Sequence, residues 1–235
     1  MFKLATSSVL WLPLTVALFC AATRVYLASG KSPLLNPTFL TLAGVITLLV
    51  TFGVAPTDYF ESVRILHYLL GTAVVALAVP LARNLARFTG DWWMLAAALA
   101  AGSLTSAVVG MLVASELGAP AELVRSIAPK AATAAVSIEI ARGIGGLPPV
   151  TACLTVVTGI VGAIMGPYVL NALAITSAAS RGLALGAASH GIATARAFAE
   201  GEATGCWASL AMGLNAVLTA ILVPLLVAVF GLPAN

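Results

Sequence analysis

Charged residues are scarce in this chain: only 8% of its 235 residues are Asp, Glu, Lys or Arg. A soluble domain carries about 25% charged residues, so this shortage excludes an ordinary soluble fold. The thinly spread net charge of +3 leaves no basic surface for nucleic acid. The chain has three cysteines without a CxxC pair, and it has no HExxH, GxSxG or phosphate-loop sequence. We therefore predict no disulfide framework, no metal site and no cofactor.

Apolar residues dominate instead, at 61% of the chain, with a mean hydropathy of +1.08. A soluble core of this size would leave much of that surface exposed, unless the solvent is lipid. In a bilayer only helices or a closed barrel satisfy the backbone, and the apolar segments are too long for barrel strands. We predict an all-α, polytopic helical membrane protein with a single transmembrane domain, residues 1–235. About eight hydrophobic segments are expected, at 7–28, 36–54, 63–82, 92–114, 123–142, 148–173, 181–199 and 205–231.

The first apolar run, 7–28, is interpreted as a spanning helix, with a cleaved signal peptide as the alternative. The basic residues that follow the first and third segments are expected in the cytoplasm by the positive-inside rule. Both chain termini then lie outside if all eight segments cross, and one re-entrant segment reverses the C-terminus. The basic residues in question are Arg24, Lys31, Arg83 and Arg87, and the acidic residues of the opposite side are Asp58, Glu61, Glu116 and Glu122.

Ionisable residues interrupt the segment 126–142. Pro129 removes a backbone donor and disfavours a continuous helix, and Lys130 follows it. Ionisable groups within a membrane usually face the protein interior or water and mark a pathway. Lys130 and Arg142 snorkelling to the interfaces is the alternative. Glu139 and Arg142 are three positions apart and are expected to pair.

A second polar cluster lies in 181–198, on a backbone rich in Gly and Ala. His190 and Thr194 share a helix face, an imidazole exchanges a proton near neutral pH, and Arg196 suits a carboxylate. We predict discontinuous or re-entrant helices around 126–142 and 181–198, and their similarity to 69–84 permits internal repeats. The face formed by Gly159, Gly162 and Gly166 is interpreted as helix packing. The expected helix-breaking positions are Pro129, Gly145, Gly146, Pro148, Gly186 and Gly191.

The loop GIGGLPPV, 143–150, has too much Gly and Pro to continue a helix. We interpret it as an ordinary loop, with carboxylate binding by its backbone N–H groups as the alternative.

Three motifs in these segments resemble the LrgB/CidB family of bacterial membrane proteins, over about Asn36 to Pro224. They are Ala128-Pro129-Lys130, Ile144-Gly145-Gly146-Leu147-Pro148, and the stretch from Arg181 through Ser189-His190 to Arg196, supported by Asn36-Pro37 and by residues 209–213. Departures from the family pattern are Ala131, Ala132, Ala134 and Ala135 after the first motif, Ala187 in place of Thr, and Ala193 in place of Gly.

The resemblance implies one of two functions in the bacterial inner membrane. The first is a secondary transporter of small monocarboxylates such as glycolate, glycerate, lactate or pyruvate. The second is a holin-like or antiholin-like modulator of murein hydrolase activity and autolysis. An intramembrane enzyme is disfavoured, because adjacent Ser189 and His190 point about 100° apart on a helix.

For the transporter hypothesis, we expect substrate binding by Lys130, Ser189, His190, Thr194, Arg196 and Asn36, and a coupling proton or ion carried by Glu139 or His190. The expected partners are a small carboxylate substrate and the lipid bilayer, with a homo-oligomer and a small LrgA/CidA-type membrane protein as further partners. No nucleic acid partner is expected.

Overall fold

The computed structural model describes residues 8–30, 32, 35–66, 68–69, 72, 82 and 92–232. The chain forms two compact units, Met1–Val75 and Ala76–Asn235. Most of the predicted segment 63–82, with Lys31, Arg83 and Arg87, lies outside the described residues. All the elements described in either unit are helices, as the composition predicts.

The first unit packs α2 (Ser8–Ala28) against α3 (Pro37–Phe52), with the short α4 (Pro56–Ser62) beside α2. Tyr59 of α4 meets Trp11 edge to face, with ring centroids 5.7 Å apart. The Tyr59 hydroxyl also lies 3.1 Å from Thr15 Oγ1. These contacts fasten α4 to the start of α2.

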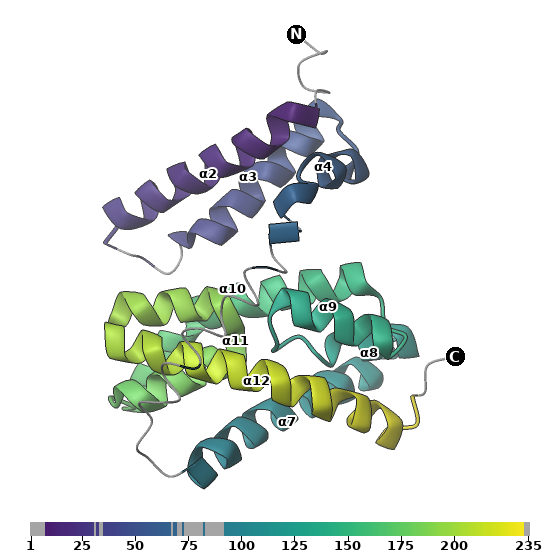
Figure 1. The fold of residues 1–235 in the computed structure, drawn as a ribbon, viewed down its shortest axis with the longest axis vertical. Helices are drawn as coiled ribbons and strands as arrows, with labels where there is room; N and C mark the ends of the chain where they lie inside the picture. The colour runs from purple at the N-terminus through teal and green to yellow at the C-terminus, as the bar shows by residue number, and fades with distance from the viewer. Residues whose placement is uncertain are drawn as a thin grey trace. The chain divides into compact units, whose positions relative to one another are not determined.

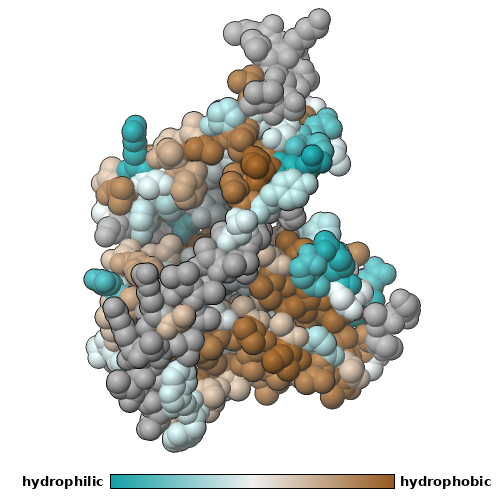
Figure 2. Space-filling model, viewed as in Figure 1, coloured by the Kyte–Doolittle hydropathy of each residue, from teal (hydrophilic) through white to brown (hydrophobic). Residues whose placement is uncertain are grey.

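The second unit contains three long apolar helices, α7 (Trp92–Glu116), α10 (Pro148–Ala172) and α12 (Glu202–Val229). Each is long and apolar enough to cross a membrane, and so is α2 in the first unit. In Figure 1 the yellow α12 passes over the blue-green α7, and the two helices are in contact. Apolar side chains cover the viewed surface along α12 in Figure 2, as expected of a helix that faces lipid.

The predicted segment 123–142 is not one helix: α8 (Ala121–Ile127) ends before Pro129, and α9 (Ala134–Gly143) begins after Thr133. After α9 the chain returns to α8, since Leu147 N donates to Ser126 Oγ at 2.7 Å. Residues 126–147, here called hairpin 1, therefore form a closed loop. A segment whose two ends touch does not cross a bilayer.

The segment α11 (Ala178–Glu200) reverses direction at Ser189 and His190, whose backbone angles are not helical. Arg181 Nε contacts Glu200 Oε2 at 2.9 Å across 19 positions. A straight helix would separate these residues by about 28 Å, so the two halves, 178–188 and 191–200, run antiparallel. Residues 181–200 are hairpin 2, and its tip is Ser189–His190.

The two hairpins enter the second unit from opposite ends of α10. At the first turn of α10, Thr151 Oγ1 donates to Ser126 O of hairpin 1 at 2.9 Å. At its last turn, Asn171 Oδ1 accepts from Arg181 Nη1 of hairpin 2 at 2.9 Å. Because α10 is about 37 Å long and the hydrocarbon core is about 30 Å thick, the hairpin bases lie at opposite faces of the membrane.

Small residues let hairpin 2 lie deep among the long helices. A Cβ on Gly159 of α10 would come within 2.6 Å of His190 Cε1, and a Cβ on Gly162 would strike Ser189. The glycine face of α10 therefore packs against the hairpin, and it makes room for the helix break itself. Gly186 was expected to break the helix, and that prediction is wrong. It lies within the first half of α11, against the backbone of Ala208.

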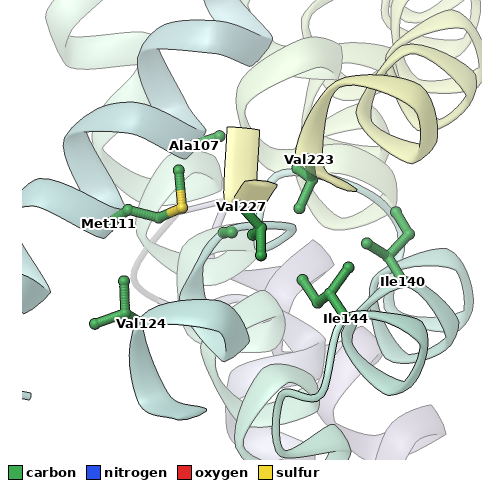
Figure 3. Close-up of a cluster of buried hydrophobic side chains, with 8 residues drawn as sticks. Ala107, Met111, Val124, Ile140, Ile144, Val223 and Val227 are labelled. Atoms are coloured by element: carbon green, nitrogen blue, oxygen red, sulfur yellow. The ribbon is translucent and has the colours of Figure 1, made fainter. Parts of the chain in front are cut away.

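Apolar clusters occupy the two ends of the second unit. One joins α7, α8, α9 and α12 and is shown in Figure 3. The other end has clusters of α10, α11 and α12 and of α7 and α12. Between these ends lies a polar layer, exemplified by the 3.2 Å pair of Ser103 Oγ and Thr219 Oγ1. The buried members of the first cluster are Ala107, Met111, Val124, Ala128, Ile140, Ile144, Val223 and Val227.

Replacing Gly186 by Ala is expected to destabilise the second unit by about 1–3 kcal/mol, the usual effect of overpacking. The new Cβ would lie 2.7 Å from Ala208 Cα and still closer to its carbonyl oxygen. Gly143→Ala is the matched control, because a Cβ there meets nothing within 4 Å. Thermal unfolding of the purified variants in detergent measures the difference, and equal melting temperatures would contradict the close packing of α11 on α12.

The hairpin topology predicts labelling of Glu122→Cys and Arg142→Cys from the same side of the membrane, and of Glu202→Cys from the opposite side. The measurement is reaction with a membrane-impermeant maleimide, in a variant lacking Cys20 and the two other native cysteines. If Glu122→Cys and Arg142→Cys react from opposite sides, residues 126–142 cross the bilayer and hairpin 1 is wrong.

Candidate functional site

Asn215, in the middle of α12, joins the two hairpins. Its Nδ2 donates to Ala131 O in the turn of hairpin 1 at 3.2 Å and to Ala187 O in hairpin 2 at 3.0 Å. The side chain is 1% exposed. One amide therefore satisfies a backbone carbonyl from each interrupted segment, and the polar ends of both hairpins meet inside the protein.

Lys130 lies in the turn of hairpin 1 and reaches α7. Its Nζ donates to Ser106 O at 2.6 Å and lies 3.2 Å from Ser106 Oγ. A Cβ at Gly110 would come within 2.7 Å of Nζ, so this glycine leaves the space that the ammonium occupies. The lysine does not snorkel to an interface, because it is bound to the middle of a long helix.

His190 forms the tip of hairpin 2 together with Ser189, and both side chains are buried. His190 Nε2 lies 2.9 Å from Thr155 O of α10, and because a carbonyl only accepts, Nε2 carries the proton and donates. The backbone of His190 has a φ of 44°. A non-glycine residue held in that region costs about 1–3 kcal/mol and often marks a functional position.

Thr194 and Arg196 lie on the returning half of hairpin 2. Thr194 Oγ1 donates to His190 O at 2.8 Å and lies 3.8 Å from Met212 Sδ. It therefore supports the turn from within. Arg196 is half-buried, two residues farther from the tip.

Glu139 is not brought to the hairpin tips, and Asn36 lies in the other unit. Asn36 belongs to the first unit, where its Oδ1 accepts from Thr38 N at 2.9 Å and caps α3. Glu139 lies on the surface of α9, and its carboxylate pairs with Arg142 at 2.6 Å, as the spacing predicts. The side chains of Glu139 and Arg142 are 65% and 61% exposed.

The glycine-rich loop before α10 uses its backbone groups to close hairpin 1. Gly146 N donates to Ala141 O at 2.8 Å, Leu147 N is bound to Ser126, and Gly145 O accepts from Arg125 Nε at 2.9 Å. Gly145 has a φ of 70° and requires glycine there. The loop is thus structural, and Pro148 begins α10.

A cavity of about 430 Å³ lies between α7 and the first half of α11. This volume is within the range of small-molecule sites, about 300–1,000 Å³. Ser106, which holds Lys130, lines the cavity, and so does Ser180 near the base of hairpin 2. The remaining lining is apolar and comprises Ala98, Leu99, Gly102, Leu183, Ala184, Ala187 and Ala188.

The tips favour an anion. In each hairpin the returning helix begins at the tip, so its first N–H groups and the positive end of its dipole lie there. No side chain caps the start of α9. The opposing carbonyl groups of Ala131 and Ala187 are bound by Asn215, and Lys130 adds a full positive charge. Such an arrangement suits a carboxylate.

Three buried oxygens near the tips make no hydrogen bond with the described part of the chain, Thr133 Oγ1, Thr155 Oγ1 and Asn215 Oδ1. Buried polar atoms are usually satisfied, so all three are available to a polar ligand. Among the described residues no group of three or more His, Cys, Asp or Glu is arranged to hold a metal ion.

Sequence reasoning missed Asn215, Ser106 and Gly110. The signal for Asn215 is an amide in the centre of an apolar run, since a polar residue within a spanning helix usually faces the protein interior. Ser106 and Gly110 sit in an Ala-, Val- and Gly-rich helix, where a serine is too common to attract notice.

The sequence profile of the LrgB-like family matches residues 15–229. The chain belongs to the LrgB-like family. As a family member with several long apolar helices, it is a polytopic helical membrane protein.

Three relatives of this LrgB-like protein align with most of its length. It is 29% identical over 223 residues to "Holin-like protein CidB" of Staphylococcus aureus strain Mu50, covering 95% of this chain and 97% of the relative. It is 34% identical over 217 residues to "Uncharacterized protein YxaC" of Bacillus subtilis strain 168, covering 92% and 94%. It is 31% identical over 194 residues to an uncharacterized protein of Haemophilus influenzae, covering 83% and 84%. No solved structure matches the chain.

Asn215→Ala is expected to lower the stability of the LrgB-like protein by about 1–3 kcal/mol, because it leaves two buried carbonyls without a donor. Ser103→Ala is the control: it removes a hydroxyl from the same polar layer, where Ser103 Oγ pairs with Thr219 Oγ1 and so links α7 to α12. Melting temperatures of the variants in detergent provide the measurement. An Asn215→Ala protein as stable as Ser103→Ala would show that the amide does not hold the hairpins.

Proposed function

We propose that this LrgB-like protein is a secondary transporter of small monocarboxylates that works by alternating access. The observation that carries the proposal is the pair of re-entrant hairpins. They enter from opposite ends of α10, and their tips meet at Asn215, while Lys130 of hairpin 1 is bound to Ser106, which lines the cavity. Transporters commonly place their sites near the midplane, at interrupted helices.

The carboxylate is assigned to the space next to Lys130 and Ser106. An ammonium bound to one backbone carbonyl and one hydroxyl has a third N–H to offer, and the helix starts at the tips add to the positive potential. A carboxylate that accepts this third N–H attracts the ammonium and so weakens its hydrogen bond to Ser106 O. Substrate binding therefore loosens the contact of hairpin 1 with α7, which couples binding to movement of that hairpin.

A coupling proton is assigned to His190 rather than to Glu139. His190 is buried at the tip of hairpin 2 and is bound to α10 through Thr155 O. Protonation or release at the imidazole changes the charge at the site itself. Glu139 is exposed and already paired with Arg142, so it lacks access to the solute path that the cavity defines.

The membrane orientation follows from the charges of the loops. The positive-inside rule assigns the start of α7, which Arg83 and Arg87 precede in the sequence, to the cytoplasm. Hairpin 2 then enters from the cytoplasmic face of a bacterial inner membrane and hairpin 1 from the outer face. In this arrangement the end of the cavity at Ser180 lies toward the cytoplasm and the end at Ser106 lies deeper in the membrane. A homo-oligomer and a small LrgA/CidA-type partner remain part of the proposal.

The alternative is a holin-like function, and the name of the Staphylococcus aureus relative favours it. A holin-like protein would permit leakage through an oligomeric opening. Such an opening does not require a buried lysine, a strained histidine and a bridging asparagine at one level of the fold.

Lys130→Ala is expected to reduce saturable uptake at least tenfold, because a hydrogen-bonded charge contributes about 1.5–3 kcal/mol. The measurement is uptake of labelled pyruvate and glycolate into proteoliposomes, with and without a pH gradient, while a trapped dye reports leakage. Arg142→Ala is the control, since it also removes one positive charge but at the surface. Dye loss without saturation, unchanged by Lys130→Ala, would exclude the transporter and support the holin-like alternative.

A further inference from the structure

The cavity between α7 and hairpin 2 has an uneven distribution of polar groups. Among the described residues that line it, the two with a hydroxyl side chain are Ser106, which contacts Lys130, and Ser180, near the hairpin base. Along α11, positions 180 and 188 are about 12 Å apart at 1.5 Å per residue. The lining between these ends consists of aliphatic side chains and one glycine.

A small monocarboxylate matches this distribution best with its charged end at Ser106 and Lys130. Its carboxylate lies at Lys130, and an oxygen on the next carbon lies within reach of the same polar end, where Ser106 offers a hydroxyl. The following carbon then lies against aliphatic side chains, with Leu99 and Gly102 on α7 and Leu183 and Ala184 on hairpin 2. A methyl group suits that position and a hydroxyl does not.

The backbone does not compensate for this lack of partners. Most of the lining residues lie within helices, where carbonyl groups accept from the chain itself. Ala187 O, nearest to the tip, accepts in addition from Asn215. A hydroxyl placed among these residues loses its hydrogen bonds to water and gains none from the protein.

We propose that the site discriminates at the third carbon of its substrate: it prefers monocarboxylates whose third carbon is a methyl group over those that carry a hydroxyl there. Lactate and glycerate are the diagnostic pair, because they differ only in a hydroxyl on the third carbon. This inference rests on the proposed function, and it selects within the class of substrates named there. The preference for lactate is expected to be roughly tenfold to a hundredfold, the range for one group in an apolar pocket.

The test is inhibition of labelled pyruvate uptake in proteoliposomes by unlabelled lactate and by unlabelled glycerate. We expect half-inhibition by lactate at a concentration at least tenfold lower than by glycerate. Ala184→Ser adds a hydroxyl to the lining and is expected to reduce that ratio severalfold. Ala195→Ser, on the exposed side of the returning half of hairpin 2, is the matched control and leaves the ratio unchanged.

Equal inhibition by the two acids, or stronger inhibition by glycerate, would overturn the inference while leaving the transporter proposal intact. Absence of saturable pyruvate uptake would instead contradict the transporter proposal. A second measurement keeps the two apart. The melting temperature of the purified protein is expected to rise more with lactate than with glycerate at equal concentration. Equal shifts, or no shift with either acid, would also overturn the inference.

Discussion

The amide of Asn215 donates hydrogen bonds to Ala131 O and Ala187 O and so joins hairpin 1 to hairpin 2. The rest of the second unit is built around these two hairpins. A helix that stops inside a bilayer exposes backbone groups that lipid does not satisfy. Both hairpins stop there, and both therefore need a partner supplied by another helix. A single side chain on α12 provides it, and this requirement brings the two tips to one place.

The glycines follow from the same constraint. A hairpin whose tip contains a serine and a histidine needs more room than a straight helix. Gly159 and Gly162 on α10 provide that room at the tip, and Gly186 provides it along the contact with α12. Gly110 on α7 does the same for Lys130. Glycines on the contact faces of these helices thus allow polar groups to be buried deep in an apolar unit.

Apolar clusters at both ends of the second unit enclose a polar layer between them. In that layer are the lysine, the histidine, the asparagine and the Ser103–Thr219 pair. The cavity connects this polar layer to the base of hairpin 2 along a mostly aliphatic surface. For the proposed transporter, the carboxylate is therefore expected at the tips and the carbon chain along the aliphatic lining.

The sequence by itself determined the helical membrane class, because so few charges and so much apolar surface leave no soluble alternative. It also determined the two interrupted segments, since Pro129 and the Gly- and Ala-rich stretch around His190 disfavour a continuous spanning helix. The tertiary structure alone decided that both segments turn back, because the contacts of Ser126 with Leu147 and of Arg181 with Glu200 are long-range. It also separated Lys130 from Glu139 and brought Lys130 to Ser106 and Asn215 to both tips. No periodicity encodes such pairings, because they depend on how helices distant in the sequence pack against each other.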